Sequence, residues 1–458
     1  MMLRRFGLLA LLLLVGLTIE GTWRARQVGF GPAACRFFSG RFSGPSQEFV
    51  KEERRQIPEA VSVIDVTGGM GDVRVQGIAG NEAAVHLRTR IYLGPEEAAR
   101  AAELAELTRA VVTEDGATLR VVVEQRSAER RAPEVGIETE VTVDVPQRLE
   151  VRVHGRHGGV WVEKVATAEV ESEHGDVQVN DVARDVAITH RHGAVTARRV
   201  GGATKVETRF GDAELAQLQG PLLLTGEHGR SQVEQAGAVT AHLQQARFTA
   251  RDLRGPVTID GEQNGVDLQG VAGEVDVSST LRDVRVFDLG GNARIKSEHG
   301  QLTIDRVAGE LVVTHAHGDV DATGIAGVTH VTMSHGNFDG RGLGEAVVRL
   351  DGGDCDVENP SGSLTLDVRR GRALVRSNKP LAAPITASTH HGDLVLELSL
   401  PTALALDAEA TGGEVHVSLP GYLATETTSA HTSGRVGDGG PAVRLKADRG
   451  DVRISVLE

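Results

Sequence analysis

The sequence predicts an all-β protein, a parallel β-solenoid (β-helix) of about 15 coils with about 18 residues in each coil. Three observations lead to this prediction. Glycines recur at a fixed spacing, apolar residues alternate with polar ones between them, and the spacing leaves no room for a helical crossover between parallel strands. We expect right-handed coiling because crossovers between parallel strands are nearly always right-handed. One short helix is expected, in an N-terminal capping region.

Two columns of glycine define the repeat. Nine of the 17 histidines precede a glycine, eight of them at one position of the repeat, and glycines at this position recur every 17 or 18 residues over two long stretches. They are Gly158, Gly175, Gly193, Gly211 and Gly229, and then Gly300, Gly318, Gly336, Gly353 and Gly371. A second column runs at the same step from Gly202 to Gly362. Each coil therefore turns twice, once at each column.

Apolar and polar residues alternate between these glycines, as in half-buried strands. Val170 and Ser172 share one parity, whereas Glu169 and Glu171 share the other. Strands this short are unstable alone, but stacking at ~4.8 Å pairs each backbone with the coils above and below. Residues 149–420 are the predicted solenoid, a rod roughly 70 Å long at that spacing.

The N-terminal part is predicted to hold three segments. In residues 1–26, Arg4 and Arg5 precede the apolar run 6–19, which is typical of a signal or anchor segment. No small-residue cleavage site follows closely, so an uncleaved membrane anchor is favoured. Residues 27–56 contain five of the ten phenylalanines and read as a juxtamembrane linker. Its aromatic residues either lie on the membrane or pack on the first folded unit, and both interpretations stay open.

Capping regions are expected at both ends, because an open terminal coil would expose a sheet edge. Residues 57–148 are the predicted N-terminal strand-helix-strand cap, with two strands in 61–77 and a helix in 95–109 that starts at Pro95. Residues 421–458 are the predicted C-terminal cap: a loop rich in glycine and threonine, then a hairpin-like pair of strands.

Several motifs resemble the bacterial DUF4097 β-strand-repeat proteins. They are IDVTGGMGDVRVQG, VTVDVPQRLEVRVHGRHGGVWVE, the repeated V-x-x-x-H-G-D-V-x-V unit and the terminal GDLVLELSLP, ALDAEATGGEVHVSLPG and DRGDVRISV. The resemblance covers about residues 48–458. It implies a β-helix similar to the head domains of cell-surface adhesins, and it supplies no catalytic residues.

The histidines admit a metal-binding or a structural interpretation. The two densest groups are His174, His190 and His192, and His299, His315, His317 and His335. Successive coils bring such residues close together, and zinc binds imidazole readily. Phe210, Asn264, Arg282, Gly352 and Arg370 interrupt the column, however, which favours the structural role. We predict that the imidazoles point inward or along the edge and hydrogen-bond turn carbonyls. No metal or other cofactor is expected.

No catalytic or cofactor-binding residue is predicted, so the sequence favours a protein that is not an enzyme. The acidic stretch 351–359 is a candidate calcium site, but a solvated acidic corner is favoured. Cys355 reads as a buried or edge thiol, and two cysteines make no disulfide framework. The formal charge of −14 gives no support for nucleic-acid binding.

The expected function is therefore that of an exported, membrane-anchored rod, with its body in the periplasm or at the cell surface. It would act as an adhesin, an envelope scaffold or a sensor, with a cell-envelope polysaccharide or another envelope protein as its partner. One alternative is a carbohydrate-active β-helix enzyme, a lyase or hydrolase. The other is a metal-binding envelope protein that uses clustered corner histidines.

Overall fold

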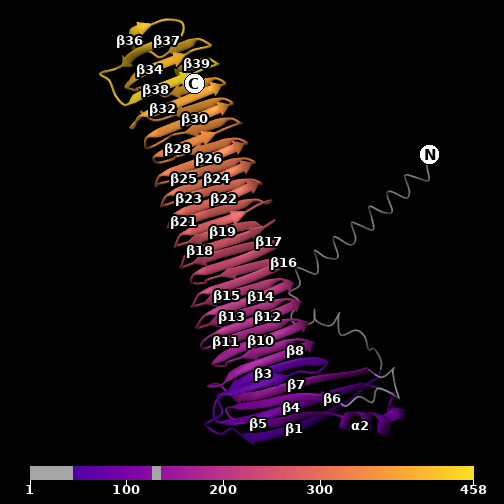
Figure 1. The fold of residues 1–458 in the computed structure, drawn as a ribbon. Coiled ribbons are helices and arrows are strands. Elements are labelled where there is room, and N and C mark those ends of the chain that lie inside the picture. Colours follow the sequence, from indigo (N-terminus) through magenta and orange to yellow (C-terminus); the bar gives the residue numbers. More distant parts are fainter. Residues whose placement is uncertain (1–44, 126–135, 458) are drawn as a thin grey trace, which may run out of the picture.

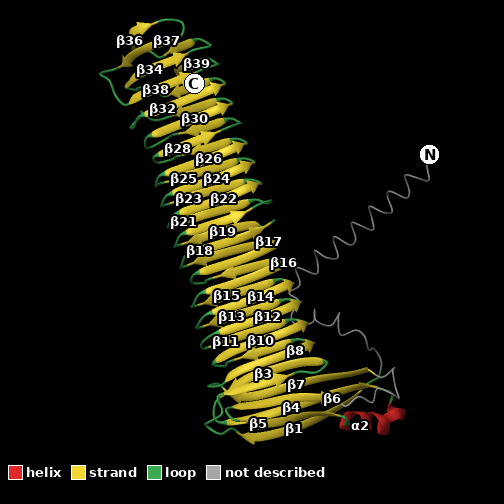
Figure 2. Cartoon of the chain, viewed as in Figure 1, coloured by secondary structure: helices red, strands yellow, loops and turns green. Residues whose placement is uncertain are grey.

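The computed structural model describes residues 45–125 and 136–457. The predicted anchor, residues 1–26, lies outside the described residues. No helix within the described ranges is long and apolar enough to span a membrane. Figure 1 shows a long rod of stacked strands, and Figure 2 shows the helix α2 (Ala98–Glu106) at its N-terminal end.

The rod consists of two ladders of parallel strands, one before and one after each His-Gly corner. We call them the first and the second sheet. Strands β16 (Leu222–Glu234) and β17 (Val239–Leu253) run through the corner and belong to both sheets. The other strands of the first sheet are β8 (Glu150–His157), β10 (Thr167–His174), β12 (Val186–His192), β14 (Thr204–Phe210), β18 (Val257–Glu262), β20 (Val275–Ser279), β22 (Ala293–His299), β24 (Leu311–His317), β26 (Thr329–His335), β28 (Ala346–Leu350), β30 (Leu364–Arg370) and β32 (Ile385–His391). Those of the second sheet are β9 (Val160–Glu163), β11 (Val177–Val182), β13 (Val195–Val200), β15 (Ala213–Leu218), β19 (Gly265–Val271), β21 (Val284–Leu289), β23 (Leu302–Val307), β25 (Val320–Ile325), β27 (Phe338–Arg341), β29 (Cys355–Glu358), β31 (Ala373–Ser377) and β33 (Leu394–Leu398).

Strand register confirms the predicted parallel solenoid. Val170 pairs with Val153 in the coil before it and with Ile188 in the coil after it, and all three are buried. The coils from β8–β9 to β33 stack in sequence order, about 14 turns in all. Burying each valine contributes about 1.5–3 kcal/mol, so the shared apolar column holds the coils together.

The N-terminal cap adds a coil that is out of sequence order. Strands β2 (Val63–Thr67) and β3 (Gly71–Ile78) lie between the β8–β9 coil and strands β6 (Thr118–Gln125) and β7 (Gly136–Pro146). Three antiparallel pairings complete this end, β1 (Gln47–Gln56) with β4 (Glu82–Tyr92), β4 with β7, and β5 (Thr108–Asp115) with β6. The β1 strand lies inside the segment predicted as a linker, and its Phe49 packs on the cluster of Ile91 and Leu104.

The helix predicted at 95–109 forms, but it is shorter than expected. A turn of 3-10 helix, η2 (Pro95–Glu97), leads into α2 (Ala98–Glu106). Strand β5 then begins at Thr108, because its backbone pairs with β6 instead of continuing the helix.

The C-terminal cap also places a coil out of order. Strands β38 (Ala442–Ala447) and β39 (Val452–Val456) lie between the coil of β32 and β33 and the coil of β34 (Leu404–Ala410) and β35 (Val415–Ser418). The predicted terminal hairpin is therefore wrong, since β38 and β39 pair in parallel with other coils. The predicted loop also contains two strands, β36 (Tyr422–Thr427) and β37 (His431–Val436), which pair antiparallel and cover β34.

Candidate binding surface

The corner glycines are required because the coils stack too closely for a side chain. A Cβ on Gly318 would overlap the carbonyl oxygen of Gly300 in the preceding coil, and Gly336 stands in the same relation to Gly318. Gly318 also has φ 134°, a conformation that residues with a side chain rarely adopt. The column of close contacts continues through Gly371, Gly392, Gly450 and Gly413, and so follows the reordered coils of the C-terminal cap.

An aspartate or asparagine that follows a corner glycine has a structural role that was not predicted from the sequence. Asp319 accepts a hydrogen bond from the backbone N–H of Asn337 in the next coil (2.8 Å), and Asn337 accepts one from Asp354 N–H (3.0 Å). These amides lie where the strands break at the corner, so the side chains supply partners that the ladder does not. The aspartate of the H-G-D motif is thus part of the corner.

The histidines that precede glycine lie on the outside of the rod, so the predicted inward orientation is wrong. His174 and His317 are exposed, and His192 is half-exposed. The chain turns at the glycine, and alternation ends there: Glu173 and His174 are consecutive and both exposed. The imidazoles stack on one another from coil to coil, with 5.0 Å between the ring centroids of His174 and His192.

Two other histidines perform the predicted inner role. His190 and His315 lie two residues before a corner histidine and are 4% and 2% exposed. The Nδ1 of His190 donates to the carbonyl oxygen of Ser172 (3.2 Å), and His315 makes the same bond to Ser297. Their Nε2 atoms have no hydrogen-bond partner among the described residues. Burial lowers the pKa of both imidazoles, so each is neutral near pH 7.

The two histidine groups predicted from the sequence are therefore split by the wall of the first sheet. His190 points inward, whereas His174 and His192 point outward, and His315 is separated in the same way from His299, His317 and His335. Among residues 45–125 and 136–457, no three His, Cys, Asp or Glu side chains are placed to hold one metal ion. Two of the predicted interruptions lie one position away from the histidine column. Asn264 aligns with Ala246 in the glycine column, and Arg282 lies against Gly300 in that same column.

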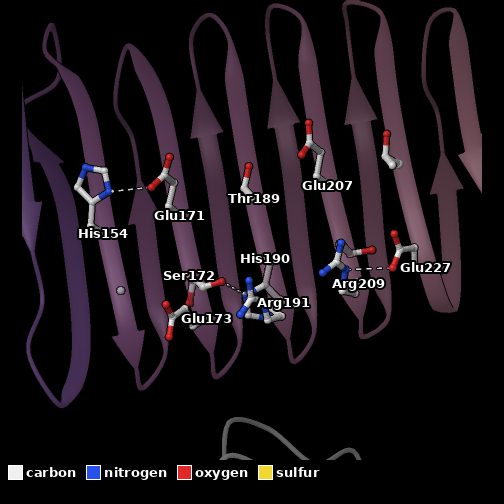
Figure 3. Close-up of a pocket in the computed structure, with 13 residues that line it drawn as sticks. His154, Glu171, Ser172, Glu173, Thr189, His190, Arg191, Glu207, Arg209 and Glu227 are labelled. Carbon is white, nitrogen blue, oxygen red and sulfur yellow. Dashed lines mark hydrogen bonds and ion pairs between the residues drawn. The ribbon is translucent and has the colours of Figure 1, made fainter.

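A groove of about 520 Å³ crosses the outer face of the first sheet from β8 to β16. Figure 3 shows its two rows of outward side chains. One row is formed by His154, Glu171, Thr189, Glu207 and Thr225. The other is formed by Glu173, Arg191, Arg209 and Glu227. Between the rows lie the positions of the inward residues Gly155, Ser172, His190 and Thr208. Alternation in the sequence predicted that such residues point outward, but it did not predict that they line a groove.

The charges in the groove are partly paired within the protein. His154 Nδ1 lies 3.2 Å from Glu171, Lys205 lies 2.7 Å from Glu207, and Arg209 lies 3.0 Å from Glu227. Arg191 and Glu173 have no hydrogen-bond or ion-pair partner among the described residues. The groove thus offers a guanidinium and a carboxylate, beside two threonine hydroxyls, to a bound molecule.

The acidic stretch 351–359 is neutralised by arginines of neighbouring coils. Asp351 lies 3.1 Å from Arg369, and Asp356 lies 3.3 Å from Arg376. Asp354 accepts the backbone N–H of Arg372 (2.8 Å). These pairings favour the structural interpretation over a calcium site. Cys355 is buried, as predicted, and burial raises the pKa of its thiol, which makes it a poor nucleophile.

The fold and surface together define a β-solenoid repeat protein whose side chains recur in columns along a rigid rod. The sequence model of the family described as Toastrack DUF4097 matches residues 98–342 and 295–455. The chain therefore belongs to the Toastrack DUF4097 family, as the sequence motifs implied.

Two solved structures are similar to this chain. One is a putative cell adhesion protein from Clostridium sporogenes ATCC 15579, with 7% identity, a TM-score of 0.18 and coverage of 89% of this chain and 100% of that chain. The other is a putative adhesin from Parabacteroides merdae ATCC 43184, with 9% identity, a TM-score of 0.16 and coverage of 89% and 96%. Because both TM-scores are low, the fold of this chain is defined by its strand register and not by its similarity to these two structures. No curated protein matches the chain.

Proposed function

We propose that the protein is an exported adhesin, envelope scaffold or sensor, anchored in a membrane by its N-terminal segment, whose rod binds an extended partner without catalysis. The basic residues Arg4 and Arg5 before the apolar run 6–19 support export and anchoring. Cell-envelope polysaccharide is the partner class we favour, with another envelope protein as the second candidate.

The groove across the first sheet is the observation that carries this proposal. It crosses five consecutive coils from His154 to Thr225 and is about as wide as two neighbouring columns of side chains. Successive coils lie about 4.8 Å apart, so a polymer chain lying along the rod meets one polar side chain of each row at every step. The unpaired Arg191 and Glu173, with the hydroxyls of Thr189 and Thr225, supply hydrogen-bond donors and acceptors for such a chain.

The ion pairing and solvent exposure of the groove carboxylates favour binding over hydrolysis. Glycosidases place two carboxyl groups on either side of the scissile bond, one of them protonated at working pH. Here three of the four groove carboxylates, those of Glu171, Glu207 and Glu227, each lie beside a cationic or imidazole partner, and their side chains are 60%, 41% and 36% exposed. The fourth, that of Glu173, is unpaired and exposed. The coils in this region keep their short repeat, so no inserted loop covers the groove.

Co-sedimentation with insoluble polysaccharides tests the proposal. The full-length chain, purified in mild detergent, would be incubated with peptidoglycan and with envelope polysaccharides, and the supernatant assayed for released sugar. We expect retention of the protein and no released sugar. Released sugar would favour the enzyme alternative, and no retention on any polymer would move the search to protein partners.

Substitution of Arg191 tests whether the groove is the surface that binds the polysaccharide. Arg191→Ala is expected to weaken retention several-fold, because Arg191 is the unpaired cation of the groove. Arg294→Ala is the matched control, since Arg294 is an exposed residue of the same sheet in β22, outside the groove. Equal losses in both variants would argue against this groove as the binding surface.

Export is tested separately by digesting intact cells and spheroplasts with a protease. The proposal predicts cleavage of the chain without lysis of the inner membrane. Protection until lysis would contradict an exported body.

A further inference from the structure

The exposed corner histidines form two continuous stacks. In the first, ring centroids are 5.0 Å apart from His157 to His174 and again from His174 to His192. In the second, they are 4.9 Å apart from His299 to His317 and from His317 to His335. The parallel register of the first sheet fixes this spacing, because each histidine pairs with the equivalent residue one coil away.

The ring nitrogens in these stacks have no hydrogen-bond or ion-pair partner among the described residues. Several histidines elsewhere on the surface differ in this respect, because each lies beside a carboxylate. His431 is 3.0 Å from Asp407, His416 is 3.4 Å from Glu414, and His154 is 3.2 Å from Glu171. Five of the six stacked imidazoles are exposed and that of His192 is half-exposed, so these closely spaced rings are available to a ligand.

Phe210 shows that the stacking of rings along this column does not require ring nitrogens. It occupies the next position after His192 and stacks on it at 5.1 Å with an interplanar angle of 6°. The same ring stacks on His228 at 5.1 Å and 4°. A ring without nitrogen thus fits the column, so stacking alone does not account for six histidines in two runs of three.

We propose that each run of three stacked histidines is a surface site for a divalent transition-metal ion, zinc or copper, held by two adjacent imidazoles. Two imidazoles on one zinc ion at 2.0–2.1 Å place their nitrogens about 3.4 Å apart at a tetrahedral angle. Neighbouring histidine rings are already tilted by 20° to 30°. Because these rings are exposed, a small side-chain rotation brings one nitrogen of each to that separation. Water completes the coordination, in keeping with the lack of any three-residue metal group in the described ranges.

The spacing also sets the number of ions. A central histidine serves one neighbour at a time, so three consecutive imidazoles hold one ion, and the two runs hold two ions per chain. Phe210→His would join His157, His174 and His192 to His228, making five consecutive imidazoles. Five imidazoles contain two separate pairs, so this variant would hold three ions per chain. The inference is independent of the proposed adhesive function.

Equilibrium dialysis of the full-length chain against Zn²⁺ at pH 7.5, with bound metal measured by mass spectrometry, tests the proposal. His174→Phe and His317→Phe each remove the central imidazole of one run and keep an aromatic ring there, as Phe210 does naturally. We expect two ions for the wild type, one for each single variant, none above background for the double variant, and three for Phe210→His.

Two results would overturn the inference. The first is equal zinc binding by the wild type and the double variant, both folded by circular dichroism. The second is no gain of zinc in Phe210→His, which tests the idea even if the double variant does not fold. His242→Gln is the control, since His242 is an exposed histidine outside both stacks and should leave the count unchanged.

Discussion

The middle of the rod and its two ends are built on different principles. From β8 to β33 each coil packs on the coils that precede and follow it in the sequence, 17 or 18 residues away over most of this length. At the ends a segment from far along the chain intervenes, β2–β3 at one end and β38–β39 at the other. The antiparallel strands β1, β4, β5, β36 and β37 then complete the edges.

This difference shows how a solenoid avoids fraying. A terminal coil in sequence order would have a neighbour on one side only and a free chain end. Here β39 lies between β33 and β35, so the end of the chain is held on both sides. The β1 strand at the opposite edge carries Lys51, Glu52, Glu53, Arg54 and Arg55, charges that discourage pairing with another chain.

The largest expected effect compares glycines of the middle and of the end. Gly318→Ala should cost about 4 kcal/mol or more, because the new Cβ overlaps the backbone of the preceding coil. Gly421→Ala should cost only about 1–2 kcal/mol, since its φ is 76° but no atom lies within 4 Å of an added Cβ. Urea unfolding of both variants measures the difference. Similar shifts of the midpoint would show that coil spacing is not what the glycine column protects.

Core truncation should reveal the interleaved end. Ile454→Ala in β39 and Ile304→Ala in β23 remove equally buried side chains, each 1% exposed, and each should cost about 2–5 kcal/mol. Hydrogen exchange should rise in β21 and β25 for the Ile304 variant. For the Ile454 variant it should rise in β33 and β35, which lie on either side of β39. Increased exchange in β33 without β35 would contradict the interleaved order.

Acid should weaken the middle of the rod through its two buried histidines. The pKa of His190 and His315 is lowered by burial, so the unfolded chain binds more protons once the pH falls below about 6.5. The free energy of unfolding is therefore expected to decrease as the pH falls from 7 to 5, by about 1.4 kcal/mol for each unit of pKa difference per histidine.

Neighbouring coils supply replacements for these histidines. Thr208 and Met333 occupy the same register positions one coil away, so His190→Thr with His315→Met should remove much of the acid sensitivity. His431→Asn, at the C-terminal end, is the control. An unchanged slope of stability against pH in the double variant would assign the acid sensitivity to other groups.

The smallest expected effect concerns the corner aspartates. Asp319→Ala should cost about 1–2 kcal/mol, because the backbone N–H of Asn337 loses its acceptor. Asp319→Asn should cost little, since Asn337 makes the equivalent bond in the next coil. Thermal unfolding of the two variants measures the difference, and an equal loss in both would point to the charge of Asp319 instead of its hydrogen bond.

The sequence predicted the coils well because their interactions are local and repeated. Val170 and Ile188 are buried as their alternation required, and glycine recurs where the chain turns. The candidate surface was predicted less well. The orientation of His174 depended on alternation ending at the corner, and the groove around Arg191 depended on which outward columns lie side by side.

The sequence by itself thus determined the coil length, the parallel stacking, the buried parity and the family. It could do so because residues that stack on one another in neighbouring coils are only 17 or 18 positions apart in the sequence. Only the tertiary structure decided that His192 lies outside although His190, two residues before it, lies inside, and that β38–β39 lies between β32–β33 and β34–β35. Both outcomes depend on contacts that no local period encodes. One is the turn geometry at a positive-φ glycine, and the other is the pairing of segments separated by intervening strands.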